Sequence, residues 1–283
     1  MAVLSAATDE SPSRFTWLVT VNAVPEVQTP LEVGLRGSTA IVLGAGPGIG
    51  ATTVQALASA GCVVLAADLN DDAARSTAST SDGEVHPVHV DVTDRASVQT
   101  LFAEAEASFG RPSAVVNVIG ISRAKGLADT TDEDWHTMLE LNLRQQFVVA
   151  QEALRVLARP GSYTAVASIN GTVSSPRNAA YGAAKAGLVS LVRSAALEFA
   201  EDGVRVNAVA PGIVETPRLK GFFDSTGMRE EFAVAVPMKR VARPADIAGA
   251  IVILVSPLAA YITGQVISVD GGASIKYPLP LTG

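Results

Sequence analysis

The sequence is poor in aromatic residues and in charge. Aromatic residues make up 5% of the 283 positions and charged residues 17%, whereas hydrophobic residues reach 48%. The apolar mass comes mainly from small and aliphatic side chains, which is typical of helices packed closely on a parallel sheet. The length allows one large α/β domain or two small ones.

Cysteine, histidine and dense basic segments are also scarce. Cys62 is the single cysteine, so no disulfide can form within the chain, which fits a reducing compartment. His86, His89 and His136 are scattered without metal-ligand spacing, so we expect no metal centre. The net charge of −7 and the absence of a Lys/Arg-rich run argue against nucleic acid as a partner.

The sequence also lacks an apolar run long enough to cross a bilayer. The run at 247–255 is too short, and no basic segment followed by a long apolar stretch marks a secretory signal. We therefore expect a cytoplasmic protein without membrane association. Residues 1–35 do not share the pattern of the rest, and we expect an N-terminal extension, either flexible or packed on a neighbour, before a catalytic domain at 36–283.

From about Ser38, short β-branched runs alternate with longer Ala-rich helical patterns. The strands are apolar on both faces, as expected for a sheet covered on both sides. This alternation predicts an α/β fold, a Rossmann-type, doubly wound, seven-stranded parallel sheet with helices on both faces. The predicted strands are 39–43, 62–67, 85–90, 114–118, 162–167, 204–209 and 265–269, and the predicted helices are 49–60, 96–109, 133–157, 179–201 and 245–255.

A glycine-rich turn follows the first predicted strand. Glycines there permit a tight strand-to-helix turn and let the backbone approach a pyrophosphate at the positive end of the next helix. No Lys-Ser/Thr pair follows, so the turn is not a P-loop. We expect a dinucleotide to bind along it, at Gly44, Gly46, Gly48, Ile49 and Gly50.

A carboxylate closes the second predicted strand. Asp68 could accept hydrogen bonds from both adenosine ribose hydroxyls and would repel a 2′-phosphate. No Arg or Lys lies in the glycine turn or immediately after Asp68, so the predicted cofactor is NAD, in preference to NADP. Leu69, and Asp91 with Val92 after the third strand, are further candidate contacts to the adenosine.

Tyr181 and Lys185 lie four residues apart in a predicted helix and therefore share one face. The cation favours the phenolate, so we expect the pKa of Tyr181 to fall below its usual value near ~10, making it a usable general acid or base. Many solvated helices carry such a pair, so its neighbours decide the interpretation.

Two further polar residues belong with this pair. Ser168 ends the fifth predicted strand, and Asn142 lies in the long helical pattern before that strand. Ligand sites in open parallel sheets gather at the carboxyl ends of the strands, so Ser168 should face the same crevice as the glycine turn. Each residue alone could be structural, Ser168 as a cap and Asn142 at a helix kink.

In combination, these features resemble the short-chain dehydrogenase/reductase family, in its compact single-domain branch. The resemblance extends over about 35–272. It rests on the glycine turn, Asp91-Val92, Asn117-Val118-Ile119-Gly120, Asn142, Ser168, Tyr181-x-x-x-Lys185, the segment 211–216, and the segments 261–265 and 269–272.

The resemblance implies an NAD(H)-dependent oxidoreductase that interconverts a secondary alcohol and a ketone by hydride transfer. Tyr181 would exchange the proton with the substrate oxygen, and Lys185 would lower its pKa and hold the nicotinamide ribose. Ser168 would hydrogen-bond the reacting oxygen, and Asn142 would anchor a water of the proton relay. Further implied cofactor contacts are Asn117, Gly120, Pro211, Gly212, Val214 and Thr216.

The sequence departs from the family at Val118 and Ile119, where Asn and Ala are usual, and at Leu43, where Thr is common. A lyase-like or regulatory nucleotide-binding protein of the same fold is the alternative function.

We expect a small or medium-sized substrate, cyclic ones included, and a homotetramer, as is common in the family. A small-residue helix face, Ala183, Ala184, Ala195 and Ala196, would permit close approach between subunits. The candidate substrate contacts are Ser122, Asn170, Asn178 and Phe222, with Arg123 and Val173 as further wall residues.

Overall fold

Seven parallel strands form one sheet in the part of the chain that the computed structural model describes, residues 33–275. Their order across the sheet is β3-β2-β1-β4-β5-β6-β7, and every neighbouring pair is parallel. The strands are β1 (Thr39–Leu43), β2 (Val63–Asp68), β3 (Val85–His89), β4 (Ala114–Asn117), β5 (Gly161–Val166), β6 (Val204–Pro211) and β7 (Val266–Val269).

The strand order reverses between β1 and β4. From β1 the chain moves outward to β3, then returns to β4 on the other side of β1 and continues outward to β7. At this point Leu43 pairs with Asn117, and both strands end there. In a doubly wound sheet such a reversal marks the place where ligands bind, beyond the carboxyl ends of the strands.

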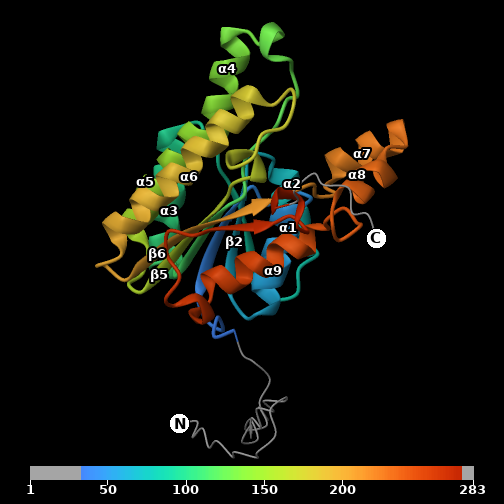
Figure 1. Cartoon of the computed structure of the whole chain (residues 1–283). Coiled ribbons are helices and arrows are strands. Elements are labelled where there is room, and N and C mark those ends of the chain that lie inside the picture. The colour runs from blue at the N-terminus through green and yellow to red at the C-terminus, as the bar shows by residue number, and fades with distance from the viewer. Residues whose placement is uncertain (1–32, 276–283) are drawn as a thin grey trace, which may run out of the picture. The chain divides into compact units, whose positions relative to one another are not determined.

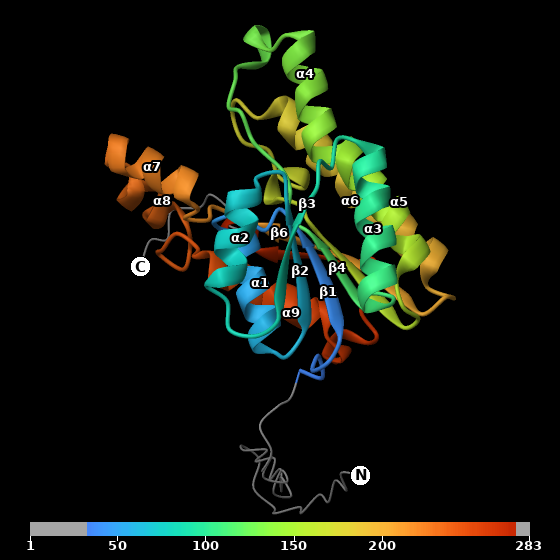
Figure 2. The ribbon, with the colours of Figure 1, turned by 180° about the vertical axis from the view of Figure 1, so that it is seen from behind.

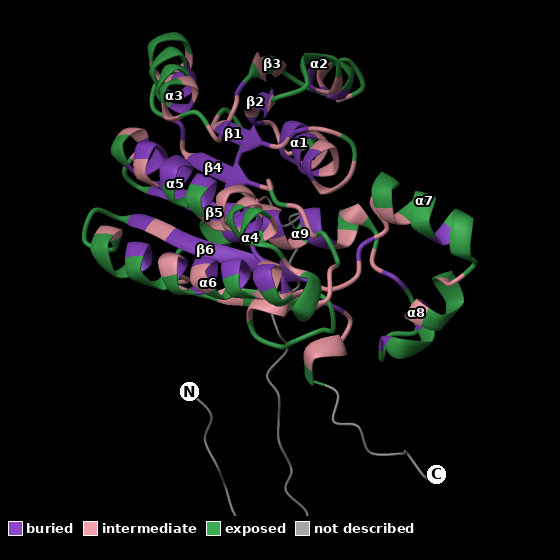
Figure 3. Cartoon of the chain, turned by 90° about the horizontal axis from the view of Figure 1, so that it is seen from above, coloured by how far each residue is buried: buried purple, intermediate pink, exposed green. Residues whose placement is uncertain are grey.

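Helices cover both faces of the sheet, so the predicted fold class is confirmed (Figures 1 and 2). One apolar core lies beneath α3, α5 and α6, and a second lies beneath α1 and α9. Seen from above, the central strands are buried between the two helical layers (Figure 3). The helices are α1 (Ile49–Ser59), α2 (Asp71–Ser79), α3 (Arg95–Phe109), α4 (Asp132–Leu139), α5 (Gln145–Val156), α6 (Ala179–Phe199), α7 (Pro217–Thr226), α8 (Arg229–Ala235) and α9 (Pro244–Val255).

Three helices have no counterpart in the sequence-based prediction. Only Ala74 and Thr77 of α2 are buried, so α2 lacks a broad apolar stripe, and its start is set by Asn70, which accepts the N–H groups of Asp72 and Ala73. Helices α7 and α8 form a small unit around Phe223 with its own minor core. Short helices of this kind give little periodicity for prediction.

The helix predicted at 133–157 is interrupted. A π-helical turn at Glu140–Arg144 separates α4 from α5 and contains Asn142. Such turns insert one extra residue into a helix and occur often at functional sites. The interruption therefore presents Asn142 toward the carboxyl ends of the strands, away from a regular helical face.

The small-residue face predicted to join subunits faces mainly inward. Ala184, Ala195 and Ala196 are buried within the chain, where α6 packs on the sheet, and of the four predicted alanines only Ala183 is exposed. The small side chains let α6 approach its own sheet closely, so this part of the prediction was wrong.

The predicted extension lies almost entirely outside the described residues. Val33 and Leu35 pack against the core beneath α1 and α9, and the compact unit begins at Val33. Between residues 33 and 275, no helix is long and apolar enough to cross a membrane.

The glycine turn is packed too tightly for a side chain at one position. A Cβ atom on Gly50, in the first turn of α1, would lie 1.8 Å from the carbonyl oxygen of Gly44. Because that oxygen belongs to the backbone of the turn, it cannot move without displacing β1 or α1.

Gly50→Ala should therefore unfold the protein or lower its melting temperature sharply. The matched control is Gly249→Ala in α9, where no atom lies within 4 Å of the added Cβ. Replacing a helical glycine there should stabilise the fold by about 0.5–1 kcal/mol. Thermal unfolding of both variants tests this, and equal melting temperatures would contradict the packing argument.

Candidate active site

The N-terminus of α1 has no polar side chain to satisfy its N–H groups. Gly48 is its N-cap, with a φ of 123°, and it provides no side-chain cap, nor does an acidic residue lie in the first turn. The free N–H groups and the helix dipole together favour an anion there. The turn from Gly44 to Gly50 therefore fits a dinucleotide pyrophosphate.

Asp68 lies against this turn. Its Oδ2 accepts the N–H of Gly46 at 2.9 Å, and its Oδ1 accepts the N–H of Asn70 at 2.9 Å. The carboxylate is thus fixed at the end of β2, with acceptor capacity left for a ribose. The neighbouring side chain of Leu69 is 62% exposed.

The surroundings of Asp68 carry little free positive charge. Asp71 and Asp72 follow it at the start of α2. Arg75 pairs with both, at 3.9 Å and 2.8 Å, and so is engaged by carboxylates of its own helix. This setting is unfavourable for a 2′-phosphate.

Asp91 lies just beyond the carboxyl end of β3, beside the buried Val92. Its Oδ1 accepts the hydroxyl of Thr93 at 2.6 Å and the N–H of Thr93 at 2.9 Å. These hydrogen bonds lower the pKa of Asp91 and fix the carboxylate at the adenosine end of the predicted cofactor groove.

Lys185 is buried without a carboxylate partner among the described residues. Its Nζ donates to the carbonyl of Val166 at 2.8 Å, and lies 5.7 Å from the centroid of the Tyr181 ring. Burial lowers the pKa of Lys185 to about 7, because a charged amine loses its hydration there.

The expected direction of the Tyr181 pKa shift was wrong. Burial raises the pKa of Tyr181, and a hydrogen bond with the Ser168 side chain partly opposes that rise. Both members of the pair share one poorly hydrated region, and desolvation disfavours the charged form of each. Spacing alone indicates that the two side chains are close, but not how well they are hydrated.

Ser168 lies two residues beyond β5 and begins a short 3₁₀ turn, Ile169–Gly171. Its Oγ accepts the N–H of Asn170 at 3.2 Å. Ser168 therefore acts as a cap, which was the structural role that the sequence suggested for it. The hydroxyl proton is not used in that bond, so Ser168 can still donate toward an oxygen beside Tyr181.

Asn142 holds the loop that follows β4. Its Nδ2 donates to the carbonyls of Ile121 at 2.9 Å and Met138 at 3.0 Å, and its Oδ1 accepts the N–H of Ile121 at 2.9 Å. Gly120 lies between Asn142 and Lys185, because a Cβ there would be 2.9 Å from Asn142 Oδ1 and 2.8 Å from Lys185 Nζ.

A buried amide network supports the same loop and involves two residues that the sequence did not single out. Asn117 Nδ2 donates to Gln145 Oε1 at 3.0 Å, and Asn117 Oδ1 accepts the N–H of Ile119 at 3.1 Å. Gln145 and Gln146 each donate to the carbonyl of Ile119 at 3.0 Å. This network fixes the backbone beside Val118, where the usual second Asn is missing. Two adjacent glutamines a few residues after Asn142 were the available signal.

The segment after β6 returns to the glycine turn. Gly212 donates its N–H to the carbonyl of Val269 at 3.2 Å, and the buried Val214 forms a β-bridge with Ala242. Thr216 caps α7, and its side chain lies about 3.5 Å from the position of a Cβ on Gly48. Pro211 ends β6, so the segment 211–216 lines the carboxyl edge of the sheet.

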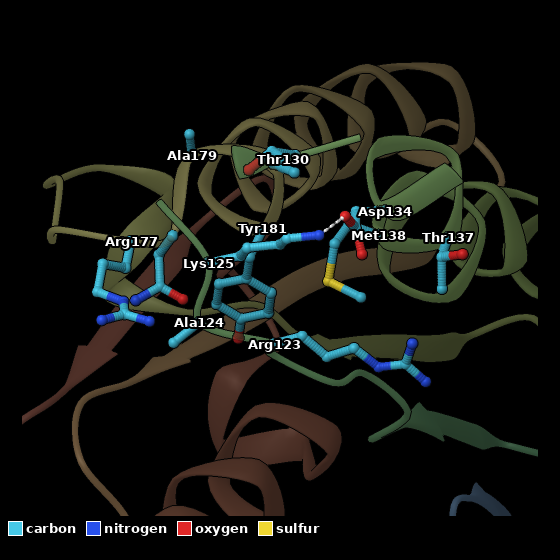
Figure 4. Close-up of a pocket in the computed structure, with 12 residues that line it drawn as sticks. Arg123, Ala124, Lys125, Thr130, Asp134, Thr137, Met138, Arg177, Ala179 and Tyr181 are labelled. Atoms are coloured by element: carbon cyan, nitrogen blue, oxygen red, sulfur yellow. Dashed lines mark hydrogen bonds and ion pairs between the residues drawn. The ribbon is translucent and has the colours of Figure 1, made fainter. Parts of the chain in front are cut away.

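A cavity of about 240 Å³ opens beside Tyr181 (Figure 4). Of the four predicted substrate residues, Asn178 lines it, and Ser122 donates its hydroxyl to Asn178 Oδ1 at 2.7 Å. Asn170 lines a second hollow of about 250 Å³. Phe222 lines neither, because its ring packs against Phe223 and Phe232. The cavity is lined by Arg123, Ala124, Lys125, Thr130, Asp134, Thr137, Met138 and residues 177–181.

The fold and the glycine turn define a Rossmann-type dinucleotide-binding protein. A family model described as enoyl-(acyl carrier protein) reductase matches residues 44–274. The 3-oxoacyl-[acyl-carrier-protein] reductase FabG of Thermotoga maritima is 34% identical over 246 residues, 85% of this chain and 99% of the relative.

Two further similarities point to the same family. The cis-4-hydroxycyclohexanecarboxylate dehydrogenase of Sinomonas cyclohexanicum is 38% identical over 239 residues, 82% of this chain and 95% of the relative. The crystal structure of gox2181 superposes with a TM-score of 0.82 at 31% identity, covering 87% of this chain and 98% of that one.

The chain belongs to the short-chain dehydrogenase/reductase family. It is an oxidoreductase that acts on an alcohol or a ketone with a nicotinamide cofactor.

The buried Lys185 amine should make folding stability depend on pH. Between pH 7 and 10.5 the Lys185 amine keeps its proton in the unfolded chain but has lost it in the folded protein. The free energy of unfolding should therefore rise with pH across that window. Lys185→Met removes this contribution. Denaturant unfolding of both proteins at several pH values should give a steeper rise for wild type, whereas parallel curves would show that Lys185 keeps its ordinary pKa.

Proposed function

We propose that this protein uses NAD(H) to interconvert a secondary alcohol and a ketone on a compact substrate, with Tyr181 as general acid and base. The observation that carries the proposal is the grouping of Tyr181, Ser168 and Lys185 at the carboxyl ends of the central strands. Tyr181, which lies close to the other two residues, lines a cavity large enough for a small ketone.

In the direction of reduction, the Tyr181 hydroxyl donates its proton to the carbonyl oxygen of the substrate. Ser168 donates a hydrogen bond to the same oxygen and stabilises the negative charge that develops on it. A nicotinamide bound along the glycine turn would supply the hydride for reduction and accept it in the reverse direction.

Lys185 prepares Tyr181 for this exchange. With a pKa of about 7, the amine can gain or lose a proton near neutrality, which suits a relay behind the phenol. Gly120 has no side chain and so leaves space beside Nζ, and Asn142 fixes the backbone that follows Gly120. We assign the relay to Lys185, with Asn142 as its positioning residue.

The preference for NAD rests on Asp68. Its carboxylate is fixed beside the glycine turn and is followed by two more acidic residues, Asp71 and Asp72. An added 2′-phosphate would meet like charge there, whereas ribose hydroxyls find acceptors.

One of the two relatives and the size of the cavity support a compact substrate. The names of the two relatives describe one enzyme acting on a 3-oxoacyl chain and one acting on a hydroxylated cyclohexane ring. A cavity of about 240 Å³ is smaller than the ~300–1,000 Å³ common for ligand pockets. This size favours a small ring, with Asn178 as a contact and Ser122 as its hydrogen-bonded support.

We also propose that the protein assembles as a homotetramer in the cytoplasm. Large apolar side chains are exposed on α5, α6 and the loop before β7, where Phe147, Leu197 and Tyr261 are 41%, 83% and 103% exposed. A second copy of this chain is the partner that would cover them.

Tyr181→Phe should lower kcat by about 10²–10⁴-fold, because it removes the proton donor, while NADH affinity stays nearly unchanged. Turnover of cyclic ketones and fluorescence titration with NADH measure the two effects. The matched control is Tyr261→Phe, which removes the same atom from a ring outside the proposed catalytic group and keeps the apolar ring at the proposed subunit contact, so it should keep full activity. Substantial turnover by Tyr181→Phe would refute the assigned role.

Asp68→Ala should weaken NADH binding by about 10–100-fold, because hydrogen bonds to a charged acceptor are lost, and should reduce discrimination against NADPH. Asp82→Ala, which removes an exposed carboxylate before β3, is the charge-matched control. Melting temperatures show whether losing the contact to Gly46 disturbs the turn. Unchanged affinity and preference in a stable variant would rule out the ribose assignment.

A further inference from the structure

The cavity beside Tyr181 carries an excess of positive charge. Three cations line it, Arg123, Lys125 and Arg177, against a single carboxylate, Asp134. This concentration contrasts with the whole chain, whose net charge is −7. The acidic residues at the start of α4, Asp132 and Glu133, are exposed to solvent and do not line the cavity.

One of the three cations is already neutralised. Lys125 forms an ion pair with Asp134 (dashed line in Figure 4). Asp134 is held in turn by Thr131, whose N–H it accepts at 3.0 Å in the capping box of α4. The pair is therefore a fixed part of the wall.

The two arginines have no such partner. Among residues 33–275, no carboxylate lies within ion-pair distance of Arg123 or Arg177. In Figure 4 they lie on opposite sides of the Tyr181 ring. Two unpaired guanidinium groups thus border the cavity that adjoins the proposed general acid.

Their loops are tied to each other and to the active site. Lys125 donates its N–H to the carbonyl of Arg177 at 2.8 Å, and Ser122 donates its hydroxyl to Asn178 at 2.7 Å. Arg177 has a φ of 63°, an uncommon conformation for a residue with a side chain. The cross-links keep Arg177 in this conformation just before α6, which carries Tyr181.

A third arginine adds to the positive potential of the same loop. Arg218, from α7, donates to the carbonyl of Ser122 at 2.8 Å. Its guanidinium therefore lies beside the backbone of the residue that precedes Arg123, although it does not line the cavity.

We propose that this cavity selects substrates that carry a carboxylate on a carbon other than the one that is oxidised or reduced, and that Arg123 and Arg177 bind that carboxylate. The inference rests on the proposed function and adds the substrate class to it. A guanidinium group matches a carboxylate in charge and in its paired hydrogen-bonding geometry. The size of the cavity favours a compact acid over a long acyl chain.

The first test compares two substrates that differ only in charge, 4-oxocyclohexanecarboxylate and 4-oxocyclohexanecarboxamide. With NADH, kcat/KM should favour the acid by about tenfold or more, since hydrogen bonds to charged groups are the stronger ones. The preference should arise mainly in KM and should shrink as salt is added, because both arginines are exposed.

The variants Arg123→Gln and Arg177→Gln, and the double variant, should raise KM for the acid and leave turnover of the amide nearly unchanged. Arg36→Gln is the control, because Arg36 is exposed and precedes β1. It therefore lies at the amino ends of the strands, whereas Tyr181 and the cavity lie near their carboxyl ends. A general effect of net charge would appear in the control as well.

A binding measurement separates this inference from the proposed function. Cyclohexanecarboxylate and cyclohexanecarboxamide are titrated into the NADH complex by calorimetry, which requires no turnover. Binding of the acid alone, lost in the double variant, supports the arginine site even if no ketone is reduced. Equal kcat/KM for the two ketones, or a preference for the acid that the double variant keeps, would overturn the inference while leaving the oxidoreductase function intact.

Discussion

The arrangement of the active site depends on one unfavourable burial, that of the Lys185 amine. Its Nζ is enclosed with a single backbone acceptor, the carbonyl of Val166, and no carboxylate within the described residues compensates its charge. A Cβ atom on residue 120 would lie 2.8 Å from the amine, so a side chain there would displace it. Removing water from this region costs stability, but it brings the pKa of Lys185 to about 7, near the pH at which the proposed proton relay would work.

The fold could be predicted because its main signals are local. Buried parallel strands such as β1 and β4 read as short aliphatic runs, and α1, α6 and α9 are long enough to show periodicity. Helix α2 escaped prediction because it is mostly polar and is stabilised by the Asn70 cap. The π-helical turn at Asn142 depends on tertiary hydrogen bonds to Ile121, which no sequence pattern encodes.

For the site, the sequence predicted which residues lie near one another, but it did not predict how far they are shielded from solvent. The four-residue spacing correctly placed Tyr181 and Lys185 together on α6. It gave no information on solvation, so the direction of the Tyr181 pKa shift was missed. Gln145 and Gln146 were missed for a related reason, since their importance lies in a shared contact with the carbonyl of Ile119.

The two halves of the site are built in different ways, and this difference bears on specificity. The proposed cofactor half consists largely of backbone groups and buried residues, such as the N-terminus of α1 and the amide network around Asn117. Substitution there would disturb the fold itself. The proposed substrate half includes exposed side chains on two loops, those of Arg123 and Arg177. Because these side chains contribute little to the core, they can change without loss of the fold. The preference for one substrate over another can therefore be set by a few surface charges, while the proposed chemistry around Lys185 stays the same.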